Sequence, residues 1–178
     1  MKDEQLQTAL MVARAAERCG LWQSGDWPGL AVELLLADFH DPEVAELAGL
    51  PRSVTGWQTD PLVSSLYERY DVHAATADDA VGLLGRLMVT DLHARPANVS
   101  SPMIRLLARL APPNYEAELA TQCFNCEEYL DCDCVVVDRS FEAELENIQP
   151  LQLPDGVVQV LVRPLRGTLP VTQPLHGH

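Results

Sequence analysis

The sequence predicts a mainly α fold, in which a small orthogonal helical bundle over residues 1–112 is followed by a small cysteine-rich α+β module over residues 113–167. Three observations predict it. Apolar residues recur at helical spacing through the first two thirds of the chain, and Asp-Pro or Ser-Pro pairs repeatedly precede them. After Pro112-Pro113 the pattern changes to clustered cysteines and β-branched runs, which favour two or three short antiparallel strands. Residues 168–178 are expected to form an extended tail.

The first two helices have clear signals. Residues 4–19 place Leu6, Leu10 and Ala13 about one helical turn apart, and Gly20 follows as a stop. Asp26-Trp27-Pro28 is predicted to start a second helix, because an aspartate can accept bonds from free backbone N–H groups and proline fits a first turn. This helix, over residues 27–38, is apolar on most sides and is expected to be central.

Four further start signals complete the bundle of about six helices. Three of them repeat the proline device, at Asp41-Pro42, Asp60-Pro61 and Ser101-Pro102. The fourth, Thr76-Ala77-Asp78-Asp79, resembles a capping box and begins a helix that should end before Pro96. The spacing of these signals is irregular, so no internal repeat is predicted.

The second part of the chain mixes helix and strand signals. A short helix is predicted over 114–122, strands over 134–137 and 157–162, a turn at 154–156, and either a strand or a helix over 141–148. Pro164 is expected to end the strand at 157–162. Strand edges exposed in such a module could pair between two chains, which is compatible with a homodimer.

A cluster of four thiols is the most unusual feature of the sequence. Cys123, Cys126, Cys132 and Cys134 follow the pattern C-x2-C-x5-C-x-C. The first pair can form a knuckle, and the second pair would face the same side of an extended strand. All four sulfurs could then reach one tetrahedral Zn²⁺ at about 2.3 Å. Because four thiolates close the coordination shell, the predicted zinc is structural rather than catalytic. Disulfides, free thiols and an iron–sulfur cluster remain alternatives.

The net charge of −14 limits the kinds of partner. Such a surface repels phosphate backbones and anionic lipid, so neither nucleic acid nor membrane is expected to bind, whereas a basic protein would be attracted. Ten acids and a single base, Arg139, lie between residues 114 and 148, around the cysteines. The acids predicted to face the partner are Glu127, Glu128, Asp131, Asp133, Glu142, Glu144 and Glu146.

A cytoplasmic location is expected. The longest apolar run, residues 31–37, is interrupted by Glu33 and is far shorter than a membrane span. The first residues, MKDEQLQTAL, carry acids where a signal peptide needs a basic start and an apolar run. Eleven arginines against one lysine fit a GC-rich bacterial genome.

The three tryptophans and Cys19 are first assigned to the core. Trp22, Trp27 and Trp57 would each bury a large apolar area, and Cys19 is a small apolar side chain at the end of the first helix. For the tryptophans the alternative is an exposed anchor for a partner, since tryptophan is enriched at binding hot spots.

Three function hypotheses follow, in order of preference. The first is a non-enzymatic protein-binding module, such as an immunity-like protein, a decoy or an adaptor, which presents an acidic face held by the four-cysteine metal site. The second is a metal- or redox-handling protein that uses the thiols directly. The third is an enzyme with an unfamiliar site. It is placed last because the sequence carries no catalytic signature: no nucleophile elbow, no phosphate loop and no His-x3-His pair.

Overall fold

The computed structural model describes residues 2–95 and 149–166, and this part of the chain is mainly helical. Its elements are α1 (Lys2–Arg18), the short 3-10 helix η1 (Ser24–Asp26), α2 (Trp27–Leu36), α3 (Pro42–Ala48), α4 (Gly56–Arg69), α5 (Ala77–Ala94) and α9 (Asp155–Arg166). The predicted mainly α class is confirmed at this level.

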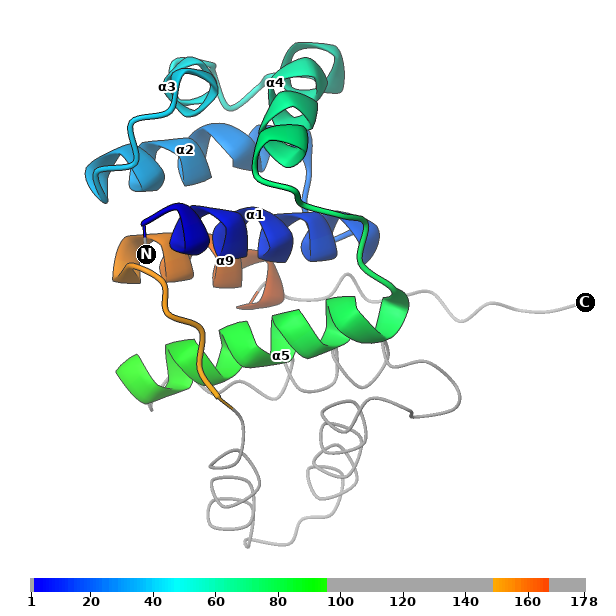
Figure 1. Cartoon of the computed structure of the whole chain (residues 1–178), viewed down its shortest axis with the longest axis vertical. Coiled ribbons are helices and arrows are strands. Elements are labelled where there is room, and N and C mark those ends of the chain that lie inside the picture. The colour runs from blue at the N-terminus through cyan, green and yellow to red at the C-terminus, as the bar shows by residue number, and fades with distance from the viewer. Residues whose placement is uncertain (1, 96–148, 167–178) are drawn as a thin grey trace, which may run out of the picture.

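Figure 1 shows α1 and α9 side by side across the middle of the molecule. The helix α5 lies on one side of them, and α2 lies on the other, followed by α3 and α4. The helix α1 packs on α5 and α9, while α9 also contacts α2. The core therefore lies around α1, whose predicted core residues Leu6, Leu10 and Ala13 are all buried.

Three helices end in the same way, with one residue in the left-handed region followed by a buried or partly buried apolar residue. The left-handed residues are Gly20 (φ 70°), Asp38 (φ 68°) and Asp71 (φ 53°), and the apolar residues after them are Leu21, Phe39 and Val72. In each case the N–H of the apolar residue donates to a carbonyl five residues earlier, at 2.8–3.0 Å, which is the Schellman pattern. The predicted stop at Gly20 is confirmed.

The two aspartates predicted to cap α2 and α3 behave differently. Asp41 caps α3, since its Oδ1 accepts the N–H of Glu43 at 3.0 Å. Asp26 precedes α2 as predicted, but its side chain does not cap that helix and accepts the N–H of Gln23 at 3.0 Å instead. The reason is local, because Asp26 already belongs to η1 and has helical backbone angles.

The predicted start of α4 at Asp60-Pro61 is wrong. The helix begins at Gly56, after Thr55, whose N–H donates to Oε1 of Gln58 at 3.4 Å. This capping interaction starts the helix five residues earlier and places Pro61 inside it. Pro61 has no N–H to donate to the carbonyl of Trp57, four residues before it.

The predicted capping box at Thr76 is confirmed. Its Oγ1 accepts the N–H of Asp79 at 3.1 Å, and its own N–H donates to Oδ2 of Asp79 at 3.4 Å. The helix that follows, α5, ends at Ala94, before Pro96 as expected. Near its end Asp91 is fully buried, paired with Arg95 of the segment just after it and with Arg166 of α9.

The strand predicted over 157–162 is also wrong, because these residues belong to the helix α9, and Pro164 lies inside that helix. The carbonyl of Pro154 accepts the N–H of Val158, so the predicted turn is the first turn of this helix. The buried residues of α9 are Val157, Val158, Leu161, Val162 and Leu165. They recur at helical spacing, and this pattern outweighs the β-branched composition.

The remaining predictions on the second part of the chain lie outside the described residues. These are the helices at Ser101-Pro102 and 114–122, the strand at 134–137, the segment 141–148 and the tail. The division into domains between residues 112 and 113 stays a prediction. Within the described part, no helix is long and apolar enough to cross a membrane.

Candidate partner-binding groove

A chain of three hollows follows the outward face of α1. The first, of about 770 Å³, is lined by Glu4, Gln5, Thr8, Met11, Leu83, Arg86 and residues 149–152. The second, also of about 770 Å³, is lined by Gln7, Met11, Asp71, His73, Ala74, Ala75, Asp79, Gly82, Leu83 and Arg86. The third, of about 460 Å³, is lined by Arg14, Ser64, Tyr67, Glu68, Asp71, Val72 and His73. Neighbouring hollows share residues, so we treat them as one groove, called the α1 groove below.

The floor of the α1 groove is apolar where the first two hollows meet. Met11 of α1 is 38% exposed there, and Leu83 of α5, which is partly buried, lines the same two hollows. A methionine is flexible and polarisable, so it adapts to side chains of different shapes. The floor can therefore accept an apolar side chain from a partner without a fixed shape requirement.

The walls of the groove carry more negative than positive charge. They are lined by four carboxylates, those of Glu4, Glu68, Asp71 and Asp79, against two arginines, and the side chain of Asp71 is 81% exposed. The two arginines in the groove are engaged within the molecule. Arg86 donates from Nε to the carbonyl of Gln149 at 3.0 Å, and Arg14 stacks over Tyr67, with 4.5 Å between its Cζ and the ring centroid.

Arg14 also donates to the carbonyl of Val72, so it ties α1 to the segment after α4. The imidazole of His73 pairs with Asp71, with 3.1 Å between Nε2 and Oδ1. His73 is 84% exposed, so this pair lies at the surface of the groove.

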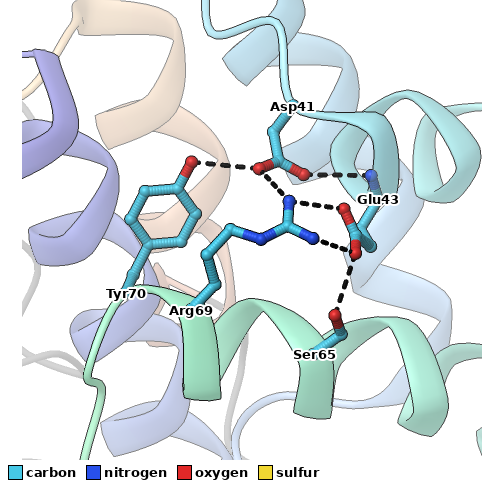
Figure 2. A network of polar contacts seen from close by, with 5 residues as sticks. All are labelled: Asp41, Glu43, Ser65, Arg69 and Tyr70. Atoms are coloured by element: carbon cyan, nitrogen blue, oxygen red, sulfur yellow. Dashed lines mark hydrogen bonds and ion pairs between the residues drawn. The ribbon is translucent and has the colours of Figure 1, made fainter.

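A polar network fixes the end of α4 and thereby the middle of the groove (Figure 2). Asp41 at the start of α3 accepts bonds from Arg69 Nη1 at 2.6 Å and from Tyr70 Oη at 3.0 Å. Arg69 also forms a two-pronged pair with Glu43, with 2.7 Å between Nη1 and Oε2. Ser65 donates to the same carboxylate at 2.9 Å.

The network connects α3 to the end of α4 and is not suited to proton transfer at neutral pH. The bonds from Arg69, and then from Ser65, lower the pKa of Glu43 to about 2. Burial, together with the bond to Asp41, raises the pKa of Tyr70 to about 12. Both groups therefore keep one protonation state at neutral pH. Gln7 of α1 donates to the carbonyl of Tyr70 at 2.8 Å. Asp71 is the next residue, so its position in the groove is fixed by the contacts of Tyr70.

A second polar group lies behind the groove. Glu17 of α1 accepts bonds from Trp27 Nε1 at 3.0 Å and from Tyr67 Oη at 2.9 Å. Burial raises the pKa of Glu17, although these two bonds act in the opposite direction. Trp27 meets Trp22 and Tyr67 edge-on, with ring centroids 5.9 and 6.1 Å away. Both carboxylate oxygens are occupied, so Glu17 ties α1, α2 and α4 together.

The residues singled out from the sequence have different outcomes. Trp22 and Trp27 are buried, which confirms the core assignment, whereas Trp57 is 77% exposed, so the core assignment is wrong for it. Cys19 is only half-buried, where burial raises the pKa of its thiol.

The four predicted zinc ligands and the seven predicted partner-facing acids lie outside the described residues. Over residues 2–95 and 149–166, no group of three or more His, Cys, Asp or Glu side chains is placed to hold a metal ion.

The sequence reasoning missed the groove residues. Met11 lies on the same face of α1 as Glu4, Gln7 and Thr8, away from the core positions of that helix. An apolar side chain on this polar face was the one sequence signal for an exposed apolar site.

Comparisons with family models, with curated proteins and with solved structures found no match to this chain. The function must therefore be argued from the groove itself.

Proposed function

We propose that this chain is a non-enzymatic protein-binding module, and that a basic segment of a partner protein binds in the α1 groove. An immunity-like protein, a decoy and an adaptor are all modules of this kind. The single observation that carries the proposal is the composition of the groove. Met11 and Leu83 form an apolar floor, and exposed carboxylates border it, while both arginines are held by contacts within the chain.

The charge of the whole chain supports the same partner. A net charge of −14 attracts a basic protein from a distance and raises the rate of association. The acidic residues between 114 and 148 would add to this attraction, and the seven acids named above remain proposed partner contacts. Burial of an apolar side chain over Met11 would then slow dissociation.

A peptide selection tests the proposal. Random peptides of roughly 16 residues, long enough as a helix to span about 24 Å, are displayed on phage and selected against the purified chain. The enriched peptides are then synthesised, and we expect them to carry net positive charge and at least one large apolar residue. Their dissociation constant should rise about tenfold for Glu4→Lys, because the substitution reverses a charge beside the floor.

Glu46→Lys is the matched control. Glu46 is exposed on α3, outside the groove, and its substitution changes the net charge by the same amount. We expect its effect to stay below about twofold, because Glu46 lies away from the groove and its charge is screened by solvent. Enriched peptides without net positive charge, or equal weakening by both substitutions, would contradict the proposal.

We also propose that Cys123, Cys126, Cys132 and Cys134 hold a structural zinc ion. Their support is the spacing of four thiols within twelve residues of a polar segment. Elemental analysis of the purified chain distinguishes this site from the alternative, a metal- or redox-handling protein. Stoichiometric, tightly held zinc agrees with a structural site, whereas exchangeable copper or a coloured iron cluster would favour the alternative.

A further inference from the structure

The outward face of α4 continues the α1 groove. Trp57, Pro61, Ser64 and Glu68 follow one another at intervals of four, three and four residues, so they lie on one face of the helix. All four are exposed. With a rise of 1.5 Å per residue, this face is about 16 Å long between Trp57 and Glu68. Ser64 and Glu68 also line the third hollow, so the face and the groove are continuous.

Trp57 is the most exposed large apolar side chain on the described part of the chain, at 77%. Tryptophan is the residue type most enriched at binding hot spots, because it offers a large rigid area at low entropic cost. Next to it, Pro61 leaves the carbonyl of Trp57 without the bond that residue 61 of a regular helix would give.

The charge on this face has the same sign as in the groove. Asp60 and Glu68 are both exposed. The nearby cation, Arg69, is turned away toward Asp41 and Glu43 on α3, as Figure 2 shows. The face therefore presents acids and a tryptophan to the solvent, while the positive charge of α4 is used internally.

We propose that the basic partner segment extends beyond the α1 groove along the outward face of α4 and places an apolar side chain against Trp57. This inference rests on the proposed function and adds to it the size and the chemistry of the partner. The segment has two apolar anchors, one for Met11 and one for Trp57, with Lys or Arg between them facing Glu68 and Asp71. A helix of about eleven residues spans the α4 face alone, so the whole segment is longer.

The test uses the basic peptides enriched by the selection above and the full chain with Trp57→Ala. We expect the dissociation constant to rise about tenfold or more, as loss of a hot-spot residue gives. The matched control is Leu36→Ala, because Leu36 of α2 is 75% exposed and lies outside the groove. Its effect should stay below about twofold. Since both side chains are exposed, circular dichroism should show unchanged folding for both variants.

Tryptophan fluorescence provides a second readout, which does not depend on a change in affinity. Trp22 and Trp27 are only 4% and 2% exposed, so Trp57 should dominate any change in tryptophan emission when a peptide binds. We expect a shift to shorter wavelength with the native chain and none with Trp57→Ala. A third variant, Ser64→Arg, places a cation on the same face and should weaken binding as well.

The outcomes separate the two proposals. Weaker binding with Trp57→Ala and with Glu4→Lys supports both. If Glu4→Lys weakens binding while Trp57→Ala and Ser64→Arg do not, the extension along α4 is overturned and the proposed function stands. If none of the three substitutions weakens the binding of the selected peptides, both proposals fail.

Discussion

Asp41 shows how much one side chain can do beyond what its sequence signal predicts. The Asp-Pro pair predicts a helix cap, and Oδ1 performs that role for the N–H of Glu43. Oδ2 in addition accepts bonds from Arg69 and Tyr70, which lie 28 and 29 residues later in the chain. The local role followed from the sequence because it involves neighbouring residues. The long-range role did not, because it depends on how α3 and α4 pack.

The same network predicts a pH dependence of stability. The pKa of Glu43 is about 2 in the folded chain, below the value of about 4.3 in an unfolded chain. A lowered carboxyl pKa stabilises the fold above the unfolded value, and this stabilisation is lost as the pH falls from about 4.5 toward 2. Glu43→Gln should therefore make the free energy of unfolding less dependent on pH in this range.

Urea unfolding of the native chain and of Glu43→Gln, measured between about pH 3 and pH 6, gives that dependence. Glu46→Gln on the same helix is the control, because Glu46 lies outside the network and should keep the native slope. Equal slopes for the native chain and for Glu43→Gln would show that the bonds from Arg69 and Ser65 do not stabilise the charged form.

At the scale of elements, most boundaries followed from caps and stops, and the two errors have different causes. The start of α4 differs from the prediction because Thr55, five residues before Asp60, caps the helix instead of the Asp-Pro pair. The helix α9 has the composition of a strand because four of the six residues at 157–162 are valines. Its sides are covered by α1, α2 and α5, and such burial lets β-branched residues occupy a helix. Neither the start of α4 nor the choice between strand and helix for α9 can be decided from local sequence alone.

The packing of α9 on α5 depends on a buried carboxylate. Asp91 is 0% exposed and pairs with Arg95, with 2.9 Å between Nε and Oδ1, and with Arg166 of α9. Asp91→Asn would leave two arginines without their buried counter-charge, and we expect it to lower the free energy of unfolding by about 3 kcal/mol. Urea unfolding measures this loss.

Asp155→Asn provides the comparison for this prediction. Asp155 also pairs with Arg95, at 2.6 Å, but its side chain is 59% exposed. Its loss should therefore cost below about 1 kcal/mol, as for exposed ion pairs. If the two substitutions destabilise the chain equally, burial of Asp91 is not what makes the α5–α9 contact strong.

At the scale of the whole molecule, the sequence predicted the mainly α class and the acidic character, but not the groove. The α1 groove is formed by side chains of α1, α4 and α5 together with residues 71–75 and 149–152, and their positions relative to one another are a property of the packed bundle. For Trp57 the sequence allows two interpretations, a core residue or an exposed anchor for a partner, and its exposure excludes the first. Met11 and Leu83 could not be told from core residues without that packing.

Chemical-shift mapping tests the central claim, that the α1 groove is where a basic partner binds, most directly. Amide spectra of the ¹⁵N-labelled chain are recorded while the tightest basic peptide from the selection is added. We predict that the largest shifts come from residues 4–14, 57–71 and 79–86, with the indole N–H of Trp57 among them. Shifts confined to α2 and α9, with these three segments unchanged, would contradict the claim.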